Sequence, residues 1–239
     1  MVNIINTGLV VLGLVGMFGV GGVDSVVAKM ATDHKILVFI DDSDTAYPQE
    51  KFEILKQDFM AALAELDEDF FYHTASVEVV STSGQPLWSG TIADIQSKKG
   101  LPLKEAIASK PFRCNHIAGG FSKLDTMLQM LDGEQFTDVK IYWVSNFYAT
   151  SRPCSRETKI VYPSPLPKNV DFVGILTQRP EVSAIGMYGV HPENMKGWGK
   201  ALEALKEWEH QSAGRAFGIY ADSQTSTALD GGLEGIATR

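Results

Sequence analysis

Apolar and polar positions follow two different periods along the chain. Short apolar runs, typical of strands buried on both faces, lie at 36–40, 139–144, 183–190 and 216–220. Apolar residues recur at the spacing of an amphipathic helix in 49–66, 117–131 and 195–208. A further strand is predicted at 70–80, and the turn-forming STSGQ after it favours an antiparallel return through PLWSGTI. This order predicts an α/β fold with a doubly wound, mostly parallel sheet and one antiparallel edge strand.

The segment 2–23 departs from this pattern because it contains no charged side chain. It is long enough to cross a bilayer, so we expect an apolar N-terminal helix that acts as a single-pass membrane anchor. A cleaved secretory signal is an alternative, with SVVA at 25–28 as the cleavage site, although no Lys or Arg precedes Lys29. A glycine-rich segment packed in a larger assembly is another. The flanking charges are too few and mixed to set an orientation, and the periplasmic face of a cell envelope is favoured.

Length and charge narrow the range of functions. With 239 residues the chain can bury one full-sized core, and we expect a membrane segment and linker at 1–30 and an α/β domain at 31–222. A proline-rich insertion at about 147–177 interrupts this domain, and the small, polar tail at 223–239 is expected to be loosely held. The net charge of -8 argues against nucleic-acid binding and fits a cation or a basic partner.

A cluster of polar residues follows directly on the first apolar run. Residues 36–48 have the sequence ILVFIDDSDTAYP, so three carboxylates and two hydroxyls come between a strand and a helix. Ligands of doubly wound sheets bind beyond the carboxyl ends of the strands, where this cluster is expected. Two interpretations stay open: the cluster caps the next helix, or it holds a cation.

Three short motifs resemble the von Willebrand factor type A domain and its metal-ion-dependent adhesion site. Asp41, Ser43 and Thr45 match its D-x-S-x-T motif after the first strand. NHIAGGF at 115–121 is similar to the second motif, with Asn115 where the family has Thr. WVSNF at 143–147 occupies the place of the third, with Asn146 where the family usually has Asp.

This resemblance implies a protein-binding module rather than an enzyme. It implies a metal site formed by Asp41, Ser43, Thr45, Asn115 and Asn146 and occupied by Mg²⁺, or by Mn²⁺ or Ca²⁺. An acidic side chain of a partner protein would complete the coordination, as part of a membrane or cell-envelope assembly. The two hydroxyls would bind the metal directly, and Asp41 would bind directly or through water, from the exposed end of its strand. Asn146 should lower the metal affinity.

A second resemblance supports an enzymatic alternative. Asp42 and Asp44 after a strand are similar to the first motif of haloacid dehalogenase-like phosphotransferases, with Asp42 as nucleophile and Asp44 as general acid. Ser145 would hold the phosphoryl oxygens, and Lys168 and Asp222 would supply the remaining motifs. The sequence departs from this family at Ala46, where a Thr is expected.

Other polar residues leave three further possibilities. His116 and His191 are expected at the same sheet edge, which makes a zinc site conceivable. Cys114 and Cys154 would project from that edge, as a disulfide in an oxidising compartment or as two thiols elsewhere. A structural subunit with a vestigial metal site is the third.

Overall fold

A computed structural model describes most of the chain between His34 and Leu233. The residues it describes are 34–43, 49–68, 72–108, 117–131, 136–147, 171–230 and 233. The segment 2–23 lies outside them, and so does the expected N-terminal helix with its anchor. Within these ranges, no helix combines the length and the apolar character needed to cross a membrane.

The strands in the described part of the chain form one mixed sheet of six. They are β1 (His34–Ile40), β2 (Ser76–Ser81), β3 (Pro86–Thr91), β4 (Asp138–Val144), β5 (Val182–Val190) and β6 (Ala216–Ala221). Their order is β3-β2-β1-β4-β5-β6, and β3 runs antiparallel to β2 at one edge while all other pairs are parallel. The predicted α/β sheet with one antiparallel edge strand is confirmed.

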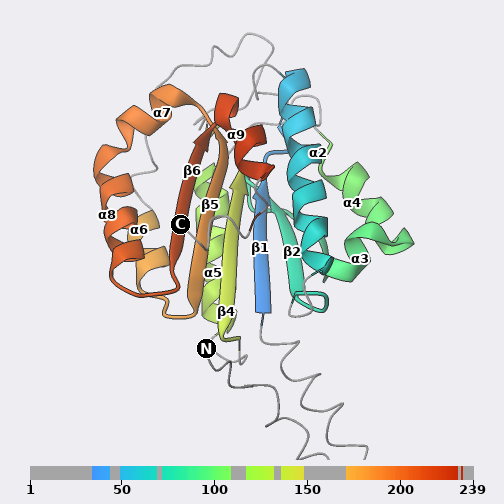
Figure 1. The fold of residues 1–239 in the computed structure, drawn as a ribbon, viewed down its shortest axis with the longest axis horizontal. Helices are drawn as coiled ribbons and strands as arrows, with labels where there is room; N and C mark the ends of the chain where they lie inside the picture. Colours follow the sequence, from blue (N-terminus) through green and yellow to red (C-terminus); the bar gives the residue numbers. More distant parts are fainter. Residues whose placement is uncertain are drawn as a thin grey trace, which may run out of the picture.

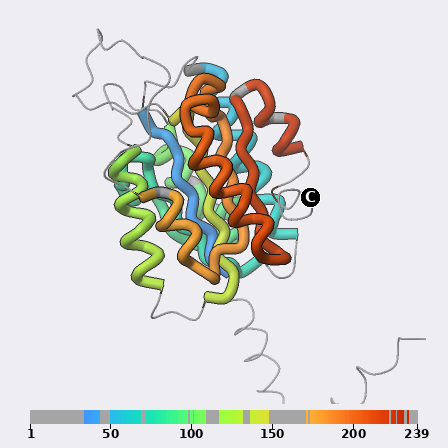
Figure 2. The backbone as a smooth tube through the Cα atoms, turned by 90° about the vertical axis from the view of Figure 1, so that its left-hand side faces the viewer, coloured from blue at the N-terminus to red at the C-terminus, as the bar shows by residue number. Residues whose placement is uncertain are grey.

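Helices cover both faces of this sheet (Figure 1). One face carries α2 (Gln49–Glu65), α3 (Ile92–Gln96), α4 (Leu101–Ala106) and α9 (Asp222–Leu229). The other face carries α5 (Ile117–Leu131), α6 (Phe172–Thr177) and α8 (Gly199–His210), and α7 (Pro192–Gly197) precedes α8. Two single-turn 3-10 helices, η1 (Leu66–Glu68) and η2 (Lys98–Gly100), complete the described elements. Figure 2 shows the sheet between the two helical layers.

The central position of β1 explains its continuous apolar run. Successive side chains of a strand point to opposite faces, so Ile36 and Val38 pack under α2, whereas Leu37 and Phe39 pack against α5. All of them are fully buried. The same pattern in β4 gives the sheet two cores, one on each face.

Two elements differ from the sequence-based prediction. The strand predicted at 70–80 begins only at Ser76, because Tyr72–Thr74 form a turn. The helix predicted at 195–208 is two helices that meet at Trp198, whose backbone (φ -99°, ψ 10°) departs from the helical region. Pro192 starts the first of them, and the buried Trp198 ring anchors the junction in the core.

The tail also differs from the expectation for 223–239, as far as it is described. Residues Asp222–Leu229 form α9, which contacts α2, β5 and β6. Buried Thr225 accepts a hydrogen bond from the Gly189 amide at 3.0 Å, and buried Leu229 joins the core under α2. Small polar residues hid this helix, whose described packing rests on Thr225, Ala228 and Leu229.

A polar network closes the amino end of the sheet. Asp138 Oδ2 lies 2.8 Å from Nδ1 of His34 and 3.1 Å from the hydroxyl of Tyr72, and Ser183 donates to Oδ1. Ser183 can reach Asp138 because the β4–β5 register shifts there. Partial burial raises the pKa of Asp138, but hydrogen bonds from Ser183 and His34 and the charge of Lys140 outweigh it and hold the pKa below its ordinary value.

We expect Asp138→Asn to lower the free energy of unfolding at pH 7 by about 1–3 kcal/mol. The folded-state pKa is depressed, so the carboxylate stabilises the fold above its unfolded pKa of about 3.9 and this contribution is lost as the pH falls through the folded value. Urea denaturation from pH 7 to pH 3 should therefore show the difference between the two proteins shrinking. A difference independent of pH would contradict this assignment. Glu193→Gln, at an exposed ion pair with Lys196, should change little.

Candidate functional site at the carboxyl edge of the sheet

The candidate site lies where the strand order of the sheet reverses. β1 and β4 are parallel neighbours, and Ile40 pairs with Val144 at their carboxyl ends. The chain leaves β1 toward α2 on one face and leaves β4 toward α6 on the other. At such a switch point the segments that follow the two strands turn to opposite faces of the sheet, and doubly wound sheets bind ligands in the crevice between them. Asp41 and Ser145 are the first residues beyond the two strands.

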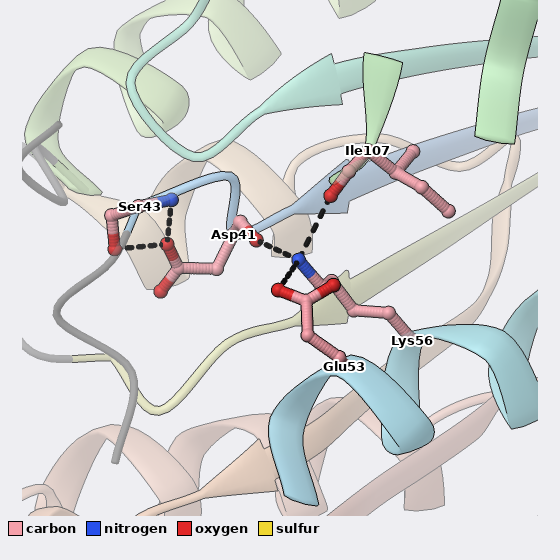
Figure 3. A network of polar contacts seen from close by, with 5 residues as sticks. All are labelled: Asp41, Ser43, Glu53, Lys56 and Ile107. Atoms are coloured by element: carbon pink, nitrogen blue, oxygen red, sulfur yellow. Dashed lines mark hydrogen bonds and ion pairs between the residues drawn. The ribbon is translucent and has the colours of Figure 1, made fainter. Parts of the chain in front are cut away.

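Asp41 joins the two strand ends through its side chain. Its Oδ1 accepts a hydrogen bond from the Ser43 amide at 3.0 Å and another from the Ser43 hydroxyl at 2.5 Å. Its Oδ2 accepts one from the Ser145 hydroxyl at 3.1 Å. In Figure 3 the carboxylate faces Ser43, while the main-chain carbonyl of Asp41 faces Lys56 on α2. The side chain thus ties the loop after β1 to the loop after β4.

Asp41 is buried rather than exposed, which corrects the expectation of an exposed strand end. Asp41, Asp42, Ser43, Ser145 and Asn146 are all at most 3% exposed. Burial raises the pKa of Asp41, although hydrogen bonds from Ser43 and Ser145 and the charge of Lys56 act in the opposite direction. The hydrogen bonds and Lys56 therefore offset only part of the cost of burying this carboxylate.

An unusual turn positions the residues after β4. Phe147 has a φ of 58°, a left-handed conformation that costs energy for a residue with a side chain. The side-chain amide of Asn194 donates to the main-chain carbonyls of Asn146 at 2.9 Å and Phe147 at 3.2 Å. The backbone amide of Phe147 donates to the Ser145 hydroxyl at 2.9 Å. The Phe147 ring is buried edge-on against Trp198 at 5.0 Å. These contacts offset the strain and hold Ser145 and Asn146 beside Asp41.

Thr82 adds a further oxygen at this edge. It follows β2 directly, and its amide donates to the Ile40 carbonyl at 3.1 Å, beside Asp41. Its hydroxyl is buried and has no hydrogen-bond partner among the described residues. A buried hydroxyl without a partner is unfavourable and marks a place where a bound water or ion would satisfy it.

The residues predicted for the metal site are brought together only in part. Asp41, Ser43 and Asn146 lie at this edge, whereas Thr45 and Asn115 fall outside the described residues. Among the residues with described positions, no three His, Cys, Asp or Glu side chains form a group that could hold a metal. The oxygens whose contacts converge are those of the Asp41 carboxylate and of the Ser43 and Ser145 hydroxyls.

This donor set fits a hard divalent cation. Mg²⁺ and Mn²⁺ prefer oxygen ligands from carboxylates, hydroxyls, carbonyls and water. The hydroxyls of Ser43 and Ser145 and the carboxylate of Asp41 are oxygen groups of this kind, and their hydrogen bonds bring them together. Such a cation would be held by Asp41 and Ser43, with Ser145 and Asn146 close by.

The residues of the alternative interpretations have other positions. The Ser145 hydroxyl donates to Asp41 Oδ2 at 3.1 Å, while Asp44 and Lys168 lie outside the described residues, as does the Asp222 side chain. His191 caps α7 by accepting the Glu193 amide at 3.3 Å. His116, Cys114 and Cys154 also lie outside the described part of the chain.

Three residues at this edge were not predicted from the sequence to belong to an adhesion-type site. Ser145 stands inside WVSNF, and its place directly after a strand is a signal that could have found it. Thr82 stands in the turn-forming STSGQ, which hid it. Lys56 lies beside the apolar positions of α2, and no sequence signal distinguishes it from a surface lysine.

Comparison with known proteins supports the fold alone. No family model matches the chain, and no curated protein sequence matches it. Among solved structures, the pilus adhesin SpaC from Lactobacillus rhamnosus GG has a TM-score of 0.51 at 8% identity, covering 83% of this chain and 29% of that one. A mutant PilB minor pilin from Streptococcus sanguinis has a TM-score of 0.49 at 8% identity, with 83% and 60% covered.

A third similar structure is proximal thread matrix protein 1 from the mussel byssus. It has a TM-score of 0.40 at 15% identity and covers 83% of this chain and 46% of that protein. This chain spans less than two thirds of the length of each of the three structures. Of these three, SpaC has a TM-score above 0.5, and at 8% identity the likeness concerns the arrangement of helices and strands.

Proposed function

We propose that this chain is a protein-binding module of von Willebrand factor type A character that contacts its partner through a divalent cation. The observation that carries the proposal is the convergence of Asp41, Ser43 and Ser145 at the switch point of the sheet. One carboxylate with neighbouring hydroxyls leaves a bound Mg²⁺ only partly neutralised. An acidic side chain of a partner protein then supplies the missing negative charge.

Two further observations support this function. The buried carboxylate with a raised pKa and the unsatisfied Thr82 hydroxyl both gain from a cation and its waters. SpaC, which has this fold, is a pilus adhesin, and we propose a role of the same general kind, contact with a protein in a larger assembly. We further propose that 2–23 anchors the module in a membrane of the cell envelope.

A metal titration and a pull-down test the proposal. Calorimetry of the full-length chain with Mg²⁺ and Mn²⁺ should show a single site, and capture of a protein partner from solubilised membranes should require the cation and fail in EDTA. The Asp41→Asn variant is the matched negative control in both assays. If neither ion binds at millimolar concentration and EDTA leaves capture unchanged, the proposed function is wrong and the DDSDT cluster is a turn and helix cap.

Asn146→Asp should strengthen cation binding by roughly tenfold or more. Asn146 is 3% exposed and lies next to Ser145, so a carboxylate there adds negative charge close to Asp41. Without metal the added charge should lower the melting temperature by repulsion, and Mn²⁺ should restore it. Calorimetry and thermal unfolding with and without Mn²⁺ measure both effects. Unchanged Mn²⁺ affinity would show that Asn146 lies away from the cation.

A further inference from the structure

Lys56 is a buried lysine whose contacts the proposed function does not yet use. Its side chain is 1% exposed, and an ammonium group removed from water needs strong acceptors to offset its lost hydration. Its Nζ donates to the Asp41 carbonyl at 3.3 Å, the Ile107 carbonyl at 2.8 Å and Glu53 Oε1 at 2.9 Å. All of these contacts are drawn in Figure 3.

The acceptors of Lys56 belong to separate parts of the fold. Asp41 begins the loop after β1, which carries Ser43. Ile107 is the C-cap residue of α4. Glu53 lies one turn before Lys56 on α2 and balances its charge. One ammonium group therefore joins the main chain of the first motif to the end of α4.

We propose that Lys56 is a positioning residue of the cation site. Its hydrogen bonds to the carbonyls of Asp41 and Ile107 hold the loop after β1, which carries Asp41 and Ser43, against the end of α4, so that these two ligands are arranged before the cation binds. This inference rests on the proposed function and adds to it a residue that touches neither cation nor partner.

The sign of the effect separates positioning from simple electrostatics. The positive charge of Lys56 lies close enough to Asp41 to lower the pKa of that carboxyl, so it also repels a cation bound there. If charge alone mattered, removing Lys56 would strengthen cation binding. If Lys56 positions the ligands, removing it weakens cation binding in spite of the relieved repulsion.

The test compares Lys56→Met with Lys35→Met in the full-length chain. Lys35 is a matched control because it is also buried, belongs to the opposite end of β1, and donates to Ser76 Oγ at 3.1 Å and to Glu78. Each substitution removes a buried lysine and its hydrogen bonds. We expect Mn²⁺ affinity, measured by calorimetry on folded protein, to fall at least about tenfold in Lys56→Met and to stay within about twofold in Lys35→Met.

The outcomes separate this inference from the proposed function. Equal or tighter Mn²⁺ binding by folded Lys56→Met overturns the positioning role, while the wild-type titration still establishes the cation site. An equal loss in both variants also overturns it, because the effect is then one of general stability. If the wild-type chain binds no Mn²⁺, the proposed function fails, and the role of Lys56 fails with it.

Hydrogen exchange of the wild-type chain tests the positioning role even if Lys56→Met does not fold. Mg²⁺ should slow hydrogen exchange of the Ser43 amide, which donates to Asp41, and also of the Ile107 amide, which donates to the Leu103 carbonyl. Ile107 carries no expected ligand, so its protection reports the link through Lys56. Protection confined to residues 41–43 would overturn the positioning role.

Discussion

Asp41→Asn is expected to abolish binding of Mg²⁺ and Mn²⁺. Substitution of residues that only support metal ligands lowers metal affinity by roughly 10–100-fold, and loss of the Asp41 charge should lower it further. Asp41 supplies the charge of the site, and the Ser43 and Ser145 hydroxyls bond to its two oxygens. An amide leaves the cation with neutral oxygens, which bind Mg²⁺ poorly. Calorimetry on the full-length variant measures the loss directly.

The Asp41→Asn variant should stay folded, which makes the result interpretable. The amide oxygen can still accept both hydrogen bonds from Ser43, and the Ser145 hydroxyl can rotate to accept from the amide nitrogen. Burial already disfavours the charged carboxyl, so the neutral amide carries a smaller desolvation cost. Asp138→Asn, at the other end of the sheet, is the control and should bind Mn²⁺ as the wild type does. Unchanged affinity in Asp41→Asn would place any cation elsewhere.

The sheet could be predicted because its strands are buried on both faces. The run at 36–40 needs apolar side chains on both sides of β1, and this requirement shows in the sequence without knowledge of the partners. The start of β2 at Ser76 and the helix junction at Trp198 could not be predicted from the sequence. The first depends on the turn before it, and the second depends on a ring anchored in the core. Local periodicity does not contain that information.

The site could be predicted only where its residues follow a strand in a recognisable order. Asp41 and Ser43 stand in such a motif. The bond between Ser145 and Asp41 joins residues 104 positions apart and depends on the β1–β4 register. Lys56 resembles the surface lysines of many helices, and it is buried where α2 packs near Asp41 and Ile107. Tertiary packing, rather than local pattern, decides these contacts.

Two glycines let α5 approach the end of β2 and thereby connect packing to the site. A Cβ atom at Gly120 would lie 2.6 Å from the Thr82 carbonyl oxygen and 3.1 Å from the Trp143 ring, and one at Gly119 would lie 2.5 Å from the Ser83 carbonyl oxygen. The backbone amide of Gly120 also donates to the Thr82 carbonyl oxygen at 3.0 Å. Glycine weakens a helix by about 1 kcal/mol relative to alanine, so close approach is the physical reason for both. α5 begins two residues after Asn115, which the second motif assigns to the site.

We therefore expect Gly120→Ala to lower the free energy of unfolding by about 1–3 kcal/mol and to weaken Mn²⁺ binding. The new methyl group meets the Thr82 carbonyl, which cannot rotate away, so α5 must shift from β2 or displace Thr82, whose amide donates to Ile40 beside Asp41. Gly199→Ala is the matched control, because it opens α8 with nothing within 4 Å of its Cβ position, and it should be neutral or stabilising by up to about 1 kcal/mol. Urea denaturation and calorimetry measure both changes. If Gly120→Ala were as stable as Gly199→Ala, the contact between α5 and Thr82 would be looser than the structure shows; if only stability fell, the position of α5 would not govern the cation site.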